Sequence, residues 1–380
     1  MLALSVTRAP STADDIKWMT LSPVVNSIEV AGRWYLHSGI QEASGGVARY
    51  YRSDLAQNAP VSAEITGYAV SAFLFLYQRT ADPAYLEAGL RAARFLTHIA
   101  WDKRLGTFPF ELLVNGGSGF AYFFDCGIIV RGLLYAWRVT KDTEFRDAAI
   151  AGGRAMLADF PCNGDLNPIL LLPEKRPRVW EPRWSASPGC YQLKSAMAWQ
   201  ELFEVTGDDA FLRAYESALE AALDNDPDFL PGDPDQRRVM DRLHAYSYFL
   251  EGLLPVLDRP DAAAAFRHGV DRAAGYLREI APLFVRSDVY AQVLRVRLLG
   301  EALGALPLDR SAAAHEAEQA ATFQIASGDP SVAGGFLFGR KEGGDTPFVN
   351  PVSTAFCMQA LTLWNDRTAG RMVAVRQELI

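Results

Sequence analysis

The sequence predicts an all-α fold, an (α/α)6 toroid of six inner and six outer helices with a few short strands in its loops. Three observations support this fold class. A helix-turn-helix junction recurs at intervals of 60 and 66 residues, strongly apolar runs alternate with amphipathic ones, and strand signals are sparse outside the longer connections. One closed ring accounts for the length of 380 residues, so we expect a single domain over 1–380.

The recurring junction consists of a threonine, one variable residue and an aspartate, followed by an aromatic residue and an alanine. Each copy ends an apolar run and begins an amphipathic one. The aspartate stands where an N-cap side chain accepts backbone N–H bonds of the next helix. The three copies begin at Thr80, Thr140 and Thr206. Each unit is therefore expected to be a helical hairpin.

The apolar runs predict inner helices, because a helix that contacts two neighbours and an outer layer must be apolar on nearly all sides. They lie at 64–78, 125–139, 190–205, 243–257, 287–304 and 351–365. The amphipathic runs predict outer helices, which keep one face in water. They lie at 13–38, 83–99, 142–158, 209–223, 261–280 and 310–325.

The connections between these helices are unequal in length. Most turns from an inner to an outer helix are short, whereas the outer-to-inner connections are long. The long ones lie at 39–63, 100–124, 159–189, 224–242 and 326–350, and a short hairpin is expected within 104–123. Long loops without regular structure are usually functional. Since they all precede inner helices, we expect the functional site at one rim of the ring, around the inner-helix amino termini.

Composition and charge exclude several classes of function. A net charge of −8 argues against a general nucleic-acid binder. The first 15 residues lack a leader pattern and no run of about 18 apolar residues follows, which favours a cytoplasmic protein that does not bind membranes. The four cysteines, Cys126, Cys162, Cys190 and Cys357, are too far apart in sequence for a zinc motif or a disulfide framework. The sequence implies no metal and no cofactor, and it does not indicate an oligomeric state.

Polar and aromatic residues recur together at the predicted rim. Aromatic rings stack on the apolar face of a sugar, while cationic, amide and carboxylate groups hold its hydroxyl and carboxyl groups. This pattern predicts a saccharide substrate. The candidate binding residues are Arg52, Trp180, Arg183, Trp184, Tyr191, Lys194, Tyr246, Tyr248, Arg286, Asp288, Tyr290 and Asn350.

Together, the repeat and these rim residues resemble the six-hairpin glycosidase superfamily, which includes unsaturated glucuronyl hydrolases and related toroids such as acylglucosamine epimerases and uronate lyases or epimerases. The resemblance covers almost the whole chain. The glucuronyl hydrolases carry essential carboxylates at the starts of neighbouring inner helices. The resemblance implies this role for Glu64 and Asp125, although the first of these positions holds Glu here and Asp in the hydrolases. The acylglucosamine epimerases use paired histidines, and this chain offers only His244 at the rim.

Glu64, Asp125 and His244 are the catalytic candidates, and each also has a structural interpretation. A carboxylate in the first turn of a helix is favoured by the free N–H groups alone. A catalytic pair would instead donate a proton with one carboxyl group while the other orients water. His244 is either a general base or a buried, hydrogen-bonded imidazole.

Three functions follow from these alternatives. The first is a glycoside hydrolase acting on an acidic oligosaccharide or polysaccharide through Glu64 and Asp125. The second is a uronate lyase or epimerase, in which His244 or a rim tyrosine removes a proton next to a carboxylate beside Arg183 or Arg286. The third is a noncatalytic glycan-binding toroid. Glu251 and Glu301, which lie within apolar runs, are expected to form ion pairs inside the ring instead.

Overall fold

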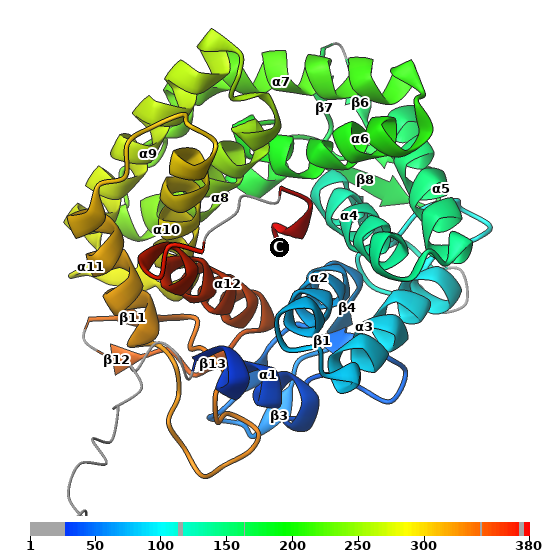
Figure 1. Ribbon diagram of the computed structural model, residues 1–380. Helices are drawn as coiled ribbons and strands as arrows, with labels where there is room; N and C mark the ends of the chain where they lie inside the picture. The colour runs from blue at the N-terminus through cyan, green and yellow to red at the C-terminus, as the bar shows by residue number, and fades with distance from the viewer. Residues whose placement is uncertain (1–26, 113–116, 163, 343, 372–375) are drawn as a thin grey trace, which may run out of the picture.

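The computed structural model describes residues 27–112, 117–162, 164–342, 344–371 and 376–380. Its helices form two concentric layers that close into a ring, as predicted (Figure 1). The inner layer consists of α2 (Ala63–Thr80), α4 (Phe123–Thr140), α6 (Leu193–Thr206), α8 (Gln236–Leu253), α10 (Ser287–Ala302) and α12 (Pro351–Thr368). The outer layer consists of α1 (Ser27–His37), α3 (Pro83–Phe95), α5 (Thr143–Asp159), α7 (Asp209–Phe229), α9 (Pro260–Ile280) and α11 (Arg310–Ala321). Contacts of α12 with α1 and α2 close the ring.

The repeated junction has the same local structure in all three copies. The aspartates accept a hydrogen bond from the amide two residues on, and the threonine hydroxyls accept one from the aspartate amide. The residue between them adopts the left-handed conformation, with φ of 59° at Ala81, 62° at Lys141 and 69° at Gly207. This geometry ends one helix and caps the next within two residues, which is why the inner-to-outer turns are short.

Glycines allow the inner helices to approach closely on the side where the carboxylates lie. A Cβ atom at Gly132 of α4 would lie 2.7 Å from the carbonyl oxygen of Gly67 in α2. A Cβ atom at Gly127 would lie 2.5 Å from Ser195 of α6. Any larger side chain at these positions would force the helices apart.

Short strands lead into the inner helices at one end of the ring, which we call the mouth. Here β4 (Val61–Ser62), β5 (Gly119–Tyr122), β10 (Phe284–Arg286) and β13 (Phe348–Val349) run directly into α2, α4, α10 and α12. Their antiparallel partners are β1 (Val47–Ala48), β8 (Ile169–Leu172), β11 (Gly339–Lys341) and β2 (Tyr51–Arg52). Five more strands extend or accompany these sheets, namely β3 (Gln57–Asn58), β6 (Pro161–Cys162) paired with β7 (Asp165–Leu166), β9 (Arg176–Pro177) and β12 (Gly344–Asp345). Within 104–123, where the sequence predicts a hairpin, β5 pairs with β8 of the next long connection, and the Phe110 amide donates a hydrogen bond to the Phe120 backbone oxygen at 2.8 Å; residues 113–116 of this segment lie outside the described residues.

One predicted connection is wrong. The segment 224–242 is mostly helical, because α7 continues to Phe229 and α8 begins at Gln236. The Asp235 side chain caps α8 by accepting a hydrogen bond from the Arg237 amide at 2.9 Å. As a result, His244 lies in the third turn of α8, not at its first or second position.

The opposite, closed end of the ring holds a network of buried charges. Glu251 pairs with Lys194, at 2.7 Å, and with Arg295, and all three side chains are fully buried. Glu201 pairs in the same way with Arg131 at 2.8 Å and Arg138 at 2.6 Å. Outside this buried network, the half-buried Glu301 pairs with Arg367 at 2.6 Å. The predicted pairing of both Glu251 and Glu301 is therefore confirmed.

The segment Arg376–Ile380 lies in the middle of the ring at this closed end (Figure 1). Leu379 and Ile380 are buried. The backbone oxygen of Ile380 accepts hydrogen bonds from Lys194 at 3.0 Å and Arg295 at 3.2 Å, so the charge network also anchors this segment. Among the described residues, no helix is both long and apolar enough to cross a membrane.

Candidate active site

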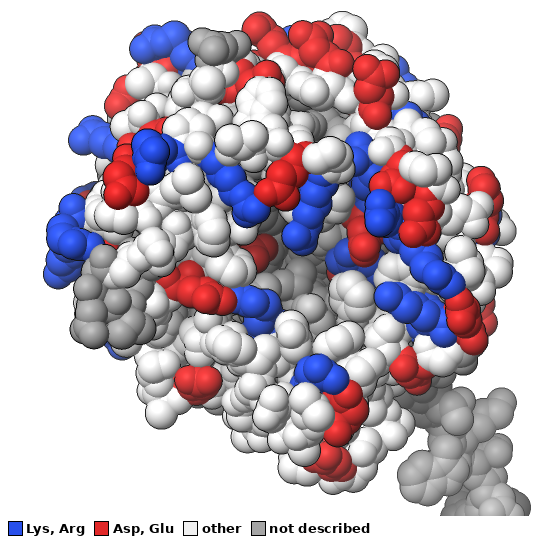
Figure 2. Space-filling view, turned by 180° about the vertical axis from the view of Figure 1, so that it is seen from behind, with Lys and Arg blue, Asp and Glu red and all other residues white. Residues whose placement is uncertain are grey.

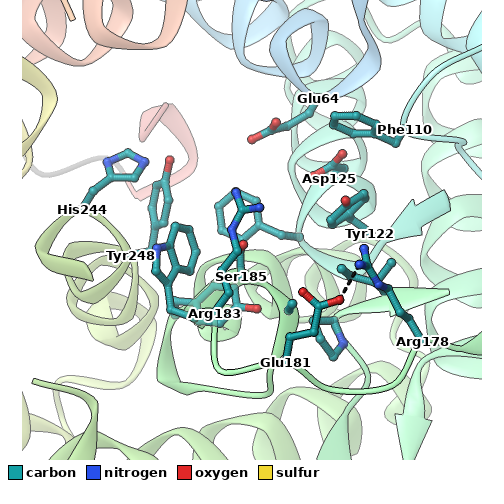
Figure 3. Close-up of a pocket in the computed structure, with 16 residues that line it drawn as sticks. Glu64, Phe110, Tyr122, Asp125, Arg178, Glu181, Arg183, Ser185, His244 and Tyr248 are labelled. Atoms are coloured by element: carbon teal, nitrogen blue, oxygen red, sulfur yellow. Dashed lines mark hydrogen bonds and ion pairs between the residues drawn. The ribbon is translucent and has the colours of Figure 1, made fainter. Parts of the chain in front are cut away.

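A cavity of about 310 Å³ opens at the mouth of the ring. It is formed by the first turns of α2 and α4, the third and fourth turns of α8, and the loop between β9 and α6 (Figure 3). It is lined by Glu64, Phe110, Tyr122, Phe124, Asp125, Pro168, Ile169, Arg178, Glu181, Arg183, Trp184, Ser185, Ala186, Tyr191, His244 and Tyr248. The three predicted catalytic residues thus come together from parts of the chain up to 180 positions apart.

Glu64 and Asp125 lie side by side on one wall of this cavity (Figure 3). Neither carboxylate is the N-cap of its helix. Ser62 caps α2, accepting a hydrogen bond from the Ile65 amide, and Tyr122 occupies the N-cap position of α4 without a side-chain bond. Oδ2 of Asp125 is buried and has no hydrogen-bond partner among the described residues. The capping interpretation therefore does not account for either side chain.

Burial shifts the titration of both carboxyl groups toward neutrality. It raises the pKa of Glu64 to about 7, against an opposing effect of Arg49. Burial also raises the pKa of Asp125 well above its usual range, and the negative charge of Glu64 raises it further. Two carboxyl groups that repel each other in this way do not both ionise readily, so the pair retains a proton near neutral pH.

Arg49 is the nearby cation that the sequence analysis missed. Its guanidinium group pairs with Glu111 at 3.0 Å and lies 4.7 Å from the ring centroid of Phe110, which lines the cavity. It lowers the pKa of both carboxyl groups. In the sequence it is one of two arginines flanking the Tyr50-Tyr51 pair, and no local signal separates it from Arg52.

His244 faces the carboxylate pair from the opposite wall (Figure 3). Its Nδ1 lies 2.8 Å from Oε1 of Gln292, and Nε2 of Gln292 donates to the backbone oxygen of His244 at 3.3 Å. This amide orientation makes Oε1 the acceptor, so Nδ1 carries the imidazole proton and Nε2 has a free lone pair. Burial, with the nearby charge of Arg286, lowers the pKa of His244 to about 4. The imidazole is therefore neutral at pH 7.

Aromatic side chains form much of the remaining wall. Tyr248 contacts His244 edge-on, with 4.5 Å between ring centroids, and Phe124 packs against Tyr248 at 4.7 Å. Trp184 meets Tyr191 edge-on at 5.1 Å. Burial and the charge of Glu64 raise the pKa of Tyr248 well above its usual range, so its hydroxyl stays protonated as a hydrogen-bond donor.

The loop before α6 supplies charged residues to the edge of the cavity. Arg178 pairs with Glu181, and Lys175 pairs with Asp159 at 2.6 Å, so these two cations are neutralised. Arg183 is exposed and has no hydrogen-bond or ion-pair partner within the described ranges. It is thus available to a ligand.

Of the predicted binding residues, Arg183, Trp184, Tyr191 and Tyr248 line the cavity, and four others near the mouth do not. Arg52 pairs with Asp54 on the surface. Trp180 is 48% exposed, on the same loop as Arg183. Asn350 caps α12, accepting hydrogen bonds from the Val352 and Ser353 amides.

Arg286 is the fourth of these and lies behind the cavity, where it forms a bidentate pair with Asp288 at 2.9 and 2.7 Å. Asp288 in turn lies 3.5 Å from Nδ1 of His244. The predicted site residues Arg286 and Asp288 thus act next to His244, not on the cavity surface.

Three predicted residues lie away from the cavity in the packed layers. Lys194 is fully buried in the ion-pair network at the closed end. Tyr246 is buried on the outward side of α8, where its hydroxyl donates to Asp226 at 2.6 Å. Tyr290 packs near His315 of α11, with 6.3 Å between ring centroids. Their positions near helix starts suggested the mouth, but helical periodicity directs these side chains into the layers.

Comparisons with known proteins agree with this fold. No protein-family model and no curated protein sequence matches the chain. A sugar epimerase from a ruminal bacterium superposes with a TM-score of 0.66 at 11% identity, over 90% of this chain and 99% of that one. The cellobiose 2-epimerase of Spirochaeta thermophila gives 0.64 at 14% identity, over 90% and 96%.

An unsaturated glucuronyl hydrolase from Streptococcus agalactiae superposes with a TM-score of 0.61 at 12% identity, over 94% of this chain and 97% of that one. These similarities are structural and the sequence identities are low. They show that the chain has the (α/α)6 toroid fold that the repeat predicted.

Proposed function

We propose that the protein is a glycoside hydrolase that acts on an acidic oligosaccharide, with Glu64 and Asp125 as its working carboxyl groups. The observation that carries this proposal is the pair itself, in which two carboxyl groups lie on one wall of the cavity, burial raises the pKa of both, and the charge of Glu64 raises the pKa of Asp125 further. Such a pair supplies one protonated and one ionised group at the same pH. Acid-catalysed cleavage of a sugar needs both forms.

The cavity walls support a saccharide as the substrate. Its aromatic rings and its unpaired Arg183 match the apolar face and the carboxylate of a uronate residue. The solved structures that share the fold include both epimerases and hydrolases of sugars. They support a carbohydrate enzyme but do not distinguish epimerisation from hydrolysis.

In the proposed reaction, the protonated carboxyl group donates its proton to the glycosidic oxygen, or to the enol-ether carbon of an unsaturated uronate. The ionised carboxylate orients a water molecule, which adds to the carbon that becomes electron-poor. On the first route the bond from the anomeric carbon to the glycosidic oxygen breaks and the leaving sugar keeps that oxygen. On the enol-ether route the added water gives a C5 hemiketal, whose ring opening leaves a C1 hemiacetal that collapses to an aldehyde and releases the leaving sugar with the glycosidic oxygen. On both routes the water proton passes to the ionised carboxylate. Tyr248 donates a hydrogen bond to the bound sugar.

A uronate epimerase or lyase is the second candidate, and the state of His244 favours it. A neutral imidazole with a free Nε2 is suited to removing the proton next to a carboxylate. Arg183 would stabilise the negative charge that develops. A mechanism with two histidines has less support, since His244 is the only histidine that lines the cavity in the described part of the chain.

The experiment that separates these candidates offers one enzyme preparation a panel of saturated and 4,5-unsaturated uronyl disaccharides in deuterated water. A hydrolase of unsaturated uronides removes the ultraviolet absorbance of the double bond and releases a reducing sugar. A lyase creates that absorbance, and an epimerase incorporates deuterium without cleavage.

Asp54→Asn is the matched control, because Asp54 is an exposed mouth residue that is absent from the cavity lining. It should keep full activity, whereas Asp125→Asn should lose it. Disaccharide binding without turnover of any panel member, and with no effect of Asp125→Asn, would favour a noncatalytic glycan-binding toroid.

A further inference from the structure

A second hollow adjoins the cavity, and we call it the arginine groove. It measures about 480 Å³ and is lined by Pro182, Arg183, Trp184, Asp233, Arg238, Asp241, Arg242 and Arg286. Arg183 and Trp184 line both hollows, so the cavity and the groove meet at these two side chains. On this face of the molecule, Figure 2 shows lysine and arginine side chains bordering the central hollow.

The groove carries an excess of positive charge on a protein whose net charge is −8. Four arginines and two aspartates line it. Two of the arginines are held by the fold. Arg286 pairs with Asp241 and Asp288, while Arg242 donates to the Phe229 backbone oxygen at 2.8 Å.

The other two arginines are available to a ligand. The Arg238 side chain is 72% exposed, and its two ion pairs are long, at 3.5 Å to Asp233 and 3.9 Å to Asp235. Arg183 has no partner within the described residues. Two accessible guanidinium groups thus line the same groove as the indole ring of Trp184, and this combination of residue types binds the anionic group of one sugar and the apolar face of another.

We propose that the arginine groove binds an anionic sugar unit of the same oligosaccharide whose reacting residue occupies the cavity. The anionic group is a carboxylate or a sulfate ester, and Arg238 is its ligand, while Arg183 at the junction of the two hollows serves the carboxylate of the reacting unit. The inference rests on the proposed function only in assuming that the cavity holds one end of a saccharide. It adds that the substrate is longer than a disaccharide and carries a negative charge beyond the reacting unit.

Binding to the full-length Asp125→Asn protein, measured by calorimetry, tests this inference without requiring turnover. The ligands are an unsaturated uronyl disaccharide, the corresponding tetrasaccharide, the tetrasaccharide with its inner carboxylate reduced to an alcohol, and an inner-sulfated, carboxyl-reduced form. We expect the carboxylated tetrasaccharide to bind about tenfold more tightly than its reduced form. If sulfate is the preferred anion, the sulfated form recovers this affinity.

Arg238→Gln should weaken tetrasaccharide binding by about threefold to tenfold and leave the disaccharide unaffected. Arg213→Gln, which removes an exposed arginine from the outer helix α7, is the control and should change neither affinity. The added affinity of the tetrasaccharide should also decline as the salt concentration rises.

Equal affinities for the charged and reduced tetrasaccharides, or no effect of Arg238→Gln, would contradict the proposal that the arginine groove binds an anionic sugar unit. Turnover of the disaccharide by the unmodified protein tests the proposed function separately. If the disaccharide is cleaved but the tetrasaccharide charge has no effect, the groove alone is wrong. If charge-dependent binding occurs without any turnover, the proposed anion binding by the arginine groove is supported and the proposed hydrolase activity is wrong.

Discussion

The carboxylates of the ion-pair network at the closed end and the pair of Glu64 and Asp125 at the mouth have opposite electrostatic surroundings. At the closed end, every carboxylate of the network has cationic partners, as Glu251 has in Lys194 and Arg295. Burial raises the pKa of Glu251, but these two cations outweigh it and the net shift is downward. At the mouth, Glu64 is half-buried and Asp125 is buried, Arg49 is the cation that opposes the shift of both, and their pKa values are raised.

This difference separates structural from chemical roles. A buried carboxylate with cationic partners stays ionised, and its ion pairs help to hold the folded state together. An unpaired one changes protonation near neutral pH, and its burial lowers the stability of the protein. The same residue types therefore have different roles at the two ends. Substitutions at each end should reveal this contrast.

The largest effect should come from Asp125→Asn. Loss of a positioned proton donor lowers kcat by about 10² to 10⁴-fold. The melting temperature should stay unchanged or rise, because the substitution removes a buried ionisable group with an unpartnered oxygen. Steady-state kinetics and thermal unfolding of the same sample check this. A variant that keeps its activity would contradict the proposed role.

Glu251→Gln should show the converse behaviour at the closed end. Removing one partner of a buried network leaves Lys194 and Arg295 without compensation, and the free energy of unfolding should fall by about 3 to 5 kcal/mol. Denaturant unfolding measures this loss. At a temperature where the variant is folded, its KM should match the parent value. A large activity defect without destabilisation would mean that the network serves catalysis.

The pH dependence of activity should report the carboxyl pair. Ionisation of Glu64, whose pKa is about 7, gives one ionised and one protonated carboxyl group, because the pKa of Asp125 is raised well above its usual range. Therefore kcat/KM should rise by about tenfold per pH unit below pH 7 and fall again only when Asp125 ionises. Stability should change in the opposite direction below pH 7. A carboxyl group with a raised pKa in the folded state favours folding while protonated, so this contribution declines as the pH rises from the unfolded value toward 7.

The double variant Glu64→Gln/Asp125→Asn should lose this decline in stability, as pH-dependent unfolding would show. A parent protein whose unfolding free energy does not fall over this interval would indicate that the carboxyl groups are not buried together.

The smallest effect is expected for His244→Gln. In the hydrolase mechanism this residue only borders the substrate, so kcat should fall by about tenfold or less. Deuterium incorporation into the sugar, measured by NMR, provides the second readout. Complete loss of turnover together with loss of deuterium incorporation would instead assign the general base to His244 and favour the epimerase.

The ring could be predicted because its signals are local. The Thr-x-Asp junctions encode a helix end, a left-handed residue and a cap within three positions, and periodicity distinguishes inner from outer helices. Glu64 and Asp125 were found because a helix start is readable from sequence. The segment 224–242 was misjudged because its prolines and charges suggested a loop, but the Asp235 cap and the packing of α8 extend the helix.

The partners of the site residues could not be predicted in the same way. Lys194 appears to be a mouth residue in sequence, yet its partner Glu251 lies 57 positions away and Ile380 lies 186 positions away. Gln292, which sets the tautomer of His244, lies 48 positions from it on another helix. Such pairings depend on which faces meet across the ring, and local patterns do not contain that information.

All six inner helices begin at the mouth, and this common direction has an electrostatic consequence. The amino-terminal end of each helix carries about half a positive charge, so six aligned dipoles add at the same opening. The field there attracts anions although the protein is acidic overall. We expect this field to guide negatively charged substrates inward and to raise their association rate, an advantage that should fade as the ionic strength increases.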